Sequence, residues 1–374
     1  MPELADIFRL HGPRYLELFQ DRLLPSHARA VRDIMECRTE ALGGHVYQCD
    51  YCGYEHYAYH SCRNRHCPKC HGKDTRDWIE KLRELILPVT YFHLVFTLPQ
   101  ELREIVRAHQ TLLLGALFQA AAYALTKLAR DPRYLGGRIG IVSVLHTWTR
   151  AMVYHPHVHC LVPGGGLSQD GTQWLSSRKT FLVPVAALSL IFRAKFMELA
   201  RSALPQLRFP DSLFKKEWVV YSKASVQGTG KVVNYLARYV HRVAITNGRI
   251  LSMDNGEVRF RYKDSREKAW KTMTLTAREF IRRFLQHVLP RGFHKVRYYG
   301  IFSPSSRHLL NRAKQLLTGN GNDENGLPAN EPMTVQPPQP HPMLCPVCKI
   351  GHLLFIVSFR QACMNWRAGG GMIG

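Results

Sequence analysis

The stretch YHPHVHCLVP at residues 154–163 has the composition of a β-strand. Alternate side chains of a strand share one face, so His157 and His159 point the same way while Val158 points to the other side. Two imidazoles in this arrangement can converge on one cation. We therefore predict that His157 and His159 hold a divalent metal, Mg²⁺ or Mn²⁺. Taken by itself, the stretch also fits a strand of solvated or hydrogen-bonded histidines.

A third ligand should come from a neighbouring strand. Residues 138–148 are an earlier strand candidate, and if they form a hairpin with this stretch that turns near residue 151, His146 falls opposite His157. His146 is therefore our first choice. His155 is the second choice, because it lies about 13 Å along the strand from the far member of the pair. His93, on a strand expected at 91–99, is a further possibility.

A second motif, KVVNYLARYVHR at residues 231–242, has helical spacing. One stripe of the helix is apolar: Val232, Val233, Leu236, Ala237 and Val240. The opposite stripe carries two tyrosines and three cations: Lys231, Tyr235, Arg238, Tyr239 and Arg242. Tyrosines at helical spacing usually pack in a core, but here the apolar stripe already supplies the core face. Cations beside a phenol attract phosphate and favour the phenolate. We predict Tyr235 and Tyr239 as nucleophiles, and the three cations as DNA contacts.

The two motifs describe complementary parts of one reaction. A phosphodiester is cleaved by an oxygen nucleophile when a cation neutralises the charge that builds on the non-bridging oxygens. A tyrosine would keep the 5′ end as a phosphotyrosine while the 3′-hydroxyl leaves. Because bond energy is conserved, ATP is not required, and the sequence has no G-x-x-x-x-G-K-[ST] loop.

The cysteines of residues 37–71 point to structural zinc. Cys49 and Cys52 form one Cys-x-x-Cys pair, and Cys67 and Cys70 form another. Two such pairs can supply four thiolates to one Zn²⁺, so we predict a site from these four residues. A second site is possible from the remaining ligand types, Cys37, His45, Cys62 and His66. Arg63 and Arg65 lie in the same segment and are predicted to contact DNA.

The chain has 374 residues and a net charge of +23, from 51 Lys and Arg against 28 Asp and Glu. Such an excess favours a nucleic-acid partner over a merely basic enzyme. No signal-peptide pattern begins the sequence, and the longest apolar run is too short for a membrane span. We expect a cytoplasmic protein, associated with the nucleoid when bound to DNA, in which cysteines bind metal instead of forming disulfides.

Four regions are expected along the chain. Residues 1–85 would form a helix and a zinc-binding, DNA-contacting domain, and residues 86–315 a catalytic domain. The Gly-, Asn- and Pro-rich residues 316–343 read as a flexible linker. Residues 344–374 would be a small tail, in which CPVCKIGH looks like half of a zinc knuckle. Within the catalytic region, Asn-Gly at AITNGRI (244–250) predicts a hairpin turn.

The histidine motif, the segment YLARYVHR (235–242) and the cysteine region 37–70 together resemble the two-tyrosine HUH transposases of the insertion-sequence-ninety-one type. The resemblance runs from about residue 37 to 310. It implies an α+β fold, with an antiparallel sheet of HUH endonuclease type, helices packed on it and a zinc-binding module in front. It also implies rolling-circle transposition on single-stranded DNA at element ends and targets. By position, His157 and His159 would be the metal ligands.

Two other functions remain open at this stage. A plasmid rolling-circle replication initiator or a relaxase would use the same chemistry on a different DNA sequence. A zinc-dependent DNA-binding regulator would bind DNA with a steep salt dependence but form no covalent adduct. A pure binder has no need for both the histidine pair and the paired tyrosines, so the sequence favours the transposase.

Overall fold

The computed structural model describes residues 2–70, 72–180, 182–224, 243–264, 267–319 and 343–360. Its central element is a five-stranded sheet with the order β12–β4–β5–β3–β8, in which every neighbouring pair is antiparallel. The strands are β3 (Tyr91–Thr97), β4 (Gly140–Trp148), β5 (Tyr154–Pro163), β8 (Val220–Ala224) and β12 (Val296–Gly300). This sheet, with helices on it, confirms the expected α+β class.

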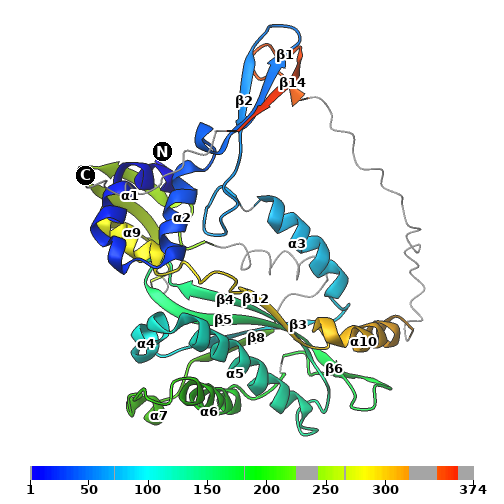
Figure 1. Ribbon diagram of the computed structural model, residues 1–374. Coiled ribbons are helices and arrows are strands. Elements are labelled where there is room, and N and C mark those ends of the chain that lie inside the picture. The colour runs from blue at the N-terminus through cyan, green and yellow to red at the C-terminus, as the bar shows by residue number, and fades with distance from the viewer. Residues whose placement is uncertain are drawn as a thin grey trace, which may run out of the picture.

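One face of the sheet is covered by helices and forms the largest core (Figure 1). The covering helices are α4 (Arg103–Ala108), α5 (Gln110–Arg130), α6 (Val185–Ala203) and α7 (Ser212–Lys215). Val158, Cys160 and Val162 of β5 point into this core, as the alternation of the strand requires. Helix α5 is long and apolar enough to cross a membrane, but 72% of its most apolar window is buried inside the protein. Its apolarity is thus accounted for by the core.

The opposite face is covered only in part among the described residues. Helices α3 (Gly72–Leu85) and α10 (Arg307–Gly319) lie over the end of the sheet near β12. There Val142 and Leu161 pack with Phe302 and Leu310 in a separate core cluster. A short hairpin, β6 (Gly165–Leu167) with β7 (Trp174–Ser176), follows β5. The histidines of β4 and β5 occupy the same face, toward its other end.

A second body contains the amino-terminal helices. Helices α1 (Leu4–Phe19) and α2 (Pro25–Glu36) share a core with α9 (Ala277–Leu285) and with the sheet β9 (Ile250–Asp254), β10 (Glu257–Lys263) and β11 (Trp270–Thr276). Phe8 meets Phe284 edge to face at 5.3 Å between ring centroids. The first helices of the chain therefore pack against residues that we expected to belong to the catalytic region.

The hairpin turn predicted at Asn247-Gly248 is wrong. Asn247–Arg249 forms a 3-10 turn, and the hairpin lies one strand later, between β9 and β10. Asn255 and Gly256 both have positive φ there, 49° and 76°, as a two-residue hairpin turn requires. Both Asn-Gly pairs carry the same local signal, and the strand pairing decides which one is used. Elsewhere in the described residues, 3-10 turns span Gln20–Arg22, Glu40–Leu42, Gln100–Leu102 and Pro304–Ser306.

A third sheet joins the two ends of the chain. It has the order β13–β14–β1–β2, with β1 (Gly44–Cys49), β2 (Glu55–Tyr59), β13 (Met343–Leu344) and β14 (His352–Phe359). Figure 1 shows β14, in red, beside the blue hairpin of β1 and β2. We expected residues 344–374 to form a separate small tail. The described part of that tail instead belongs to the amino-terminal sheet.

Candidate active site

Three histidines meet on the less covered face of the central sheet. His146 of β4 is paired directly with His157 of β5, which confirms the register predicted from the sequence. His159, two residues further along β5, lies opposite Val144 and therefore on the same face. The triad combines two residues of one strand with one residue of its hairpin partner.

The three rings are close enough to share one ion. Nε2 of His159 lies 3.1 Å from Nδ1 of His146. The ring centroids are 4.5 Å apart for His146 and His159, 4.9 Å for His157 and His159, and 5.5 Å for His146 and His157. One ring nitrogen from each residue lies within 4.8 Å of the other two. Three imidazoles that leave further coordination positions open are a donor set suited to a catalytic divalent metal.

Neighbouring groups orient two of these rings. Nδ1 of His157 lies 2.7 Å from the main-chain oxygen of His155. A carbonyl can only accept a hydrogen bond, so Nδ1 carries the proton and Nε2 is the nitrogen left to bind a cation. Nδ1 of His159 lies 2.9 Å from Nε2 of His93. The strand β3 thus supplies an outer contact of the kind that orients metal-bound histidines.

The imidazole of His157 is kept neutral, which is the form that binds metal. Desolvation by the surrounding protein lowers the pKa of His157 to about 4. Burial likewise lowers the pKa of His93 to about 4. Because its neutral form predominates well below pH 7, His157 can donate a lone pair without first losing a proton.

The other two candidate ligands, His155 and His93, are not members of this triad. The ring of His155 accepts a hydrogen bond from Arg103 at 3.2 Å, and it is not part of the triad. Desolvation, helped by the charge of Arg103, lowers the pKa of His155. His93 contacts His159 from behind and is likewise outside the triad. The geometry thus agrees with His146 as the first choice.

A cavity with basic walls lies beside the start of β5. Apolar groups and six charged residues line it, four arginines and two glutamates: Arg103, Arg107, Arg282, Arg283, Glu101 and Glu104. Arg282 and Arg283 are both paired with Glu279, at 2.6 and 2.8 Å. Arg103 connects the cavity to the histidine strand through its hydrogen bond to His155. The cavity could therefore accommodate a polyanion at the start of the histidine strand.

A buried histidine connects the central sheet to the second body. His287, just after α9, lies 3.3 Å from the hydroxyl of Thr147 and 3.3 Å from the main-chain oxygen of Met152. Burial lowers its pKa to about 4. The unfolded chain takes up this proton near pH 6.5, whereas the folded chain does so only near pH 4. The neutral ring is therefore an acid-sensitive part of the fold.

We expect His287→Gln to reduce the loss of stability in acid. For the wild type, the contribution of this group is fully present above pH 6.5 and is lost as the pH falls toward 4, at a cost of about 3 kcal/mol. Urea unfolding of both proteins at pH 7 and pH 4 measures it. The exposed-site control His308→Gln should follow the wild-type curve. Equal acid losses in wild type and His287→Gln would contradict the prediction.

The predicted nucleophiles Tyr235 and Tyr239 lie outside the described residues, as do Lys231, Arg238 and Arg242. The last described strand before them is β8, which ends at Ala224 and pairs with β3. Strand β3 in turn pairs with β5, where Val95 lies opposite His159. Strand β8 is therefore two strands away from the strand that carries His157 and His159.

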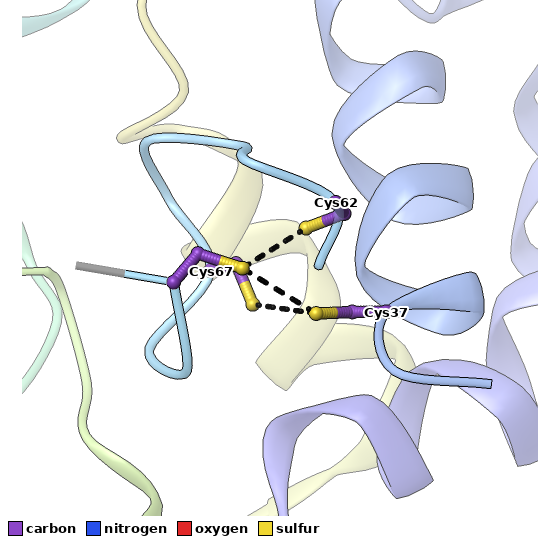
Figure 2. Close-up of side chains that lie close together, drawn as sticks. Cys37, Cys62 and Cys67 are labelled. Carbon is purple, nitrogen blue, oxygen red and sulfur yellow. Dashed lines mark hydrogen bonds between the residues drawn. The ribbon is translucent and has the colours of Figure 1, made fainter. Parts of the chain in front are cut away.

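A cluster of four cysteines lies where the amino-terminal hairpin meets the second body. It consists of Cys37, Cys62, Cys67 and Cys70. Figure 2 shows the sulfurs of Cys37, Cys62 and Cys67 pointing toward one another. The Sγ–Sγ separations are 3.4 Å for Cys37–Cys70, 3.6 Å for Cys62–Cys70 and 3.7 Å for Cys67–Cys37. Hydrogen bonding from Cys62 and the other thiols lowers the pKa of Cys67 to about 6.

These separations fit zinc. Four sulfurs at about 2.3 Å from a tetrahedral Zn²⁺ would be about 3.8 Å from one another. A disulfide requires about 2.05 Å, which none of these contacts approaches. The donor set is therefore a closed structural site of four thiolates.

The predicted grouping of the cysteines is corrected by the structure. Cys67 and Cys70 do lie together, but Cys49 and Cys52 belong to a different cluster with Cys345 and Cys348. The sequence-based set of Cys49, Cys52, Cys67 and Cys70 is therefore wrong as one site. The reason is topological, because the hairpin of β1 and β2 carries the first pair away from the second (Figure 1).

Neither predicted histidine joins a cysteine cluster. His45 contacts Ser358 through Nδ1 at 2.7 Å and His60 through Nε2 at 3.3 Å. Nε2 of His66 accepts the main-chain N–H of Leu289 at 3.4 Å. The alternative set of Cys37, His45, Cys62 and His66 thus contributes its two cysteines only.

The two arginines of this segment have different surroundings. The guanidinium of Arg65 donates to the main-chain oxygens of Phe293 and Pro290, the latter at 2.7 Å. Those contacts give it a structural role between the two bodies. Arg63 is exposed, with a positive φ of 51°, and borders a surface pocket beside β2. Contact with DNA therefore stays a prediction that fits Arg63 better than Arg65.

Comparison with known proteins agrees with this geometry. Residues 7–98 match the family model described as a transposase zinc-binding domain, and residues 140–309 match one described as a putative transposase. The chain is 41% identical to "Putative transposase y4qJ" of Sinorhizobium fredii over 96% of both chains. It is 31% identical to "Transposase for insertion sequence element IS801" of Pseudomonas savastanoi pv. phaseolicola, over 73% of this chain and 69% of the relative. No solved structure matches the chain with significance.

Proposed function

Since this chain belongs to the transposases of the insertion-sequence-ninety-one type, we propose that it cleaves and rejoins single-stranded DNA through 5′-phosphotyrosine intermediates in rolling-circle transposition. The observation that carries the proposal is the convergence of His146, His157 and His159 on one face of the central sheet. Such an enzyme would work in the cytoplasm on nucleoid DNA. Tyr235 and Tyr239 are the proposed nucleophiles.

The protein's contribution to a bound metal is its positioning. Nε2 of His157, Nε2 of His159 and Nδ1 of His146 would hold Mg²⁺ or Mn²⁺, which supplies charge neutralisation at a non-bridging phosphate oxygen. His93 and the main-chain oxygen of His155 hold two of the rings in place from behind. The lowered pKa of His157 keeps its ring neutral, and able to bind a cation, at physiological pH.

The covalent step is an exchange of phosphate esters. The phenol oxygen of Tyr235 or Tyr239 forms a bond to phosphorus, and the bond from phosphorus to the 3′ oxygen breaks. The phenol proton leaves as the phenolate forms, and the departing oxygen takes up a proton to become a 3′-hydroxyl. The reverse attack by a 3′-hydroxyl restores the strand and frees the tyrosine. Two tyrosines allow one end to be held while a second is captured.

DNA binding is supported by charge. The net charge of +23 favours a polyanion, and the basic cavity at the start of β5 is linked to the histidine strand through the hydrogen bond from Arg103 to His155. Arg103 and Arg107 are proposed to contact phosphates there. Lys231, Arg238 and Arg242 are proposed to do so around the nucleophiles.

The proposal is tested with a labelled single-stranded oligonucleotide that spans the end of the element. Incubation with the purified chain and Mg²⁺ or Mn²⁺ should join the protein covalently to the 5′ phosphate of the fragment on the 3′ side of the cut, seen as a shifted band in denaturing gels. Chelation by EDTA should prevent it. Tight, salt-sensitive binding without an adduct at any metal concentration would identify a DNA-binding regulator. Cleavage confined to a plasmid origin would identify a replication initiator or relaxase.

A further inference from the structure

A second group of four cysteines joins the two ends of the chain. Cys49 and Cys52 lie at the end of β1, and Cys345 and Cys348 lie just before β14. The sulfurs of Cys49 and Cys348 are 3.6 Å apart, and those of Cys52 and Cys345 are 3.7 Å apart. These values again match the edges of about 3.8 Å in a tetrahedral Zn–S₄ site, and exclude disulfides.

The two Cys-x-x-Cys turns have the same backbone conformation. The N–H of Gly53 donates to the main-chain oxygen of Cys49 at 3.1 Å, and the N–H of Lys349 donates to that of Cys345 at 3.0 Å. Both donors have positive φ, 71° for Gly53 and 58° for Lys349. A lysine in the left-handed region is uncommon, so its presence at the matching position indicates that the second turn is held in shape.

The turns also direct main-chain N–H groups at the sulfurs. The N–H of Cys52 lies 3.5 Å from Sγ of Cys49, and the N–H of Gly351 lies 3.4 Å from Sγ of Cys348. Such contacts stabilise thiolates. A Cβ at Gly351 would lie 2.5 Å from the carboxylate of Asp50 and 2.6 Å from Sγ of Cys49. The two turns therefore approach so closely that glycine is required there.

We propose that Cys49, Cys52, Cys345 and Cys348 bind a second structural Zn²⁺, which fastens the carboxy-terminal strand to the amino-terminal hairpin. The zinc-binding family model covers residues 7–98, so Cys345 and Cys348 lie far outside it. The site is separate from the cluster around Cys67, and it does not depend on the proposed DNA chemistry.

The local packing explains why a metal is needed. The core of the sheet around this cluster contains little more than Cys49, Cys345 and Leu353, with Tyr47 and Cys348 packed against it. Most of β14 is exposed: Leu354, Phe355, Ile356 and Val357 keep 48–57% of their surface accessible. A sheet with so small a core gains little from apolar burial. The bound metal would act as a clip between the two ends of the chain. It must close a loop between Cys52 and Cys345, which are 293 positions apart.

Zinc counting by native mass spectrometry tests the proposal on the full chain. We expect two zinc ions in the wild type and one in the double variant Cys345→Ser, Cys348→Ser. Cys363→Ser, at a cysteine outside the described residues, is the matched control and should keep two. Cys62→Ser with Cys67→Ser should also lose one ion, from the other cluster. One zinc in the wild type, or two in the Cys345/Cys348 variant, would overturn the proposal, as would a mass lighter by two hydrogens for each disulfide.

A second measurement reports the clip itself. A protease site is introduced within residues 320–342, and the chain is cut there after purification. The carboxy-terminal piece should co-elute with the rest of the wild type on gel filtration and separate in the Cys345/Cys348 variant. Separation of the wild-type pieces in the presence of zinc would contradict a metal clip. Since neither readout uses DNA, failure of the transposition chemistry would leave both results unchanged.

Discussion

The double variant Tyr235→Phe, Tyr239→Phe should form no covalent adduct with single-stranded DNA, a loss on the order of a thousandfold or more. Each change removes one hydroxyl and keeps the ring, so the apolar stripe of the helix predicted at 231–242 is untouched. Without a phenol oxygen no ester to phosphorus can form, whatever the metal concentration. The measurement is adduct yield in denaturing gels, with DNA binding measured in parallel and expected to change little.

The control for this experiment is Tyr221→Phe. Tyr221 lies on β8 opposite Val95, so it shares the face of the sheet that carries the triad, and 52% of its surface is exposed. It should form adduct like the wild type. If the adduct survived in the double variant and disappeared in Tyr221→Phe, the nucleophile would have been assigned to the wrong tyrosine. Each single variant at residue 235 or 239 should still cleave, but should fail to hold two DNA ends.

The triad could be predicted because it depends on short-range rules. Strand alternation places His157 and His159 on one face, and a hairpin that turns near residue 151 aligns His146 with His157. Both rules act over fewer than about twenty residues, where the chain has few alternatives. The contact of His93 with His159 is harder to predict from the sequence, because it depends on the pairing of β3 with β5 across a long connection.

The cysteine clusters could not be sorted in the same way. The Cys-x-x-Cys pairs at 49–52, 67–70 and 345–348 have equal spacing, and each can form half of a zinc site. Which halves combine depends on where β1 and β14 meet, a contact between residues about 300 positions apart. The number of cysteines does indicate two zinc sites. The three pairs together with Cys37 and Cys62 make eight thiols, enough for two complete sites.

Substitution of the triad should separate a metal site from a strand of merely hydrogen-bonded histidines. We expect His159→Gln and His146→Gln each to weaken Mn²⁺ binding by at least about a hundredfold and to reduce adduct formation to match. Each variant removes a ring nitrogen that lies within 4.8 Å of the other two. The measurements are Mn²⁺ affinity by paramagnetic resonance and adduct yield as a function of metal concentration.

The size of the loss in Mn²⁺ affinity should distinguish the metal ligands from the histidines around them. His155→Gln is the matched control on the same strand: its ring binds Arg103 and is not part of the triad, so Mn²⁺ affinity should stay near that of the wild type. His93→Gln should fall between, at roughly tenfold, because it removes only the group that orients His159. Excess Mn²⁺ should restore part of the activity in His146→Gln, which a folding defect would not allow. A larger effect at His155 than at His146 would move the third ligand to β5. If all four variants kept the Mn²⁺ affinity of the wild type, the histidines would form a hydrogen-bonded network and not the metal site.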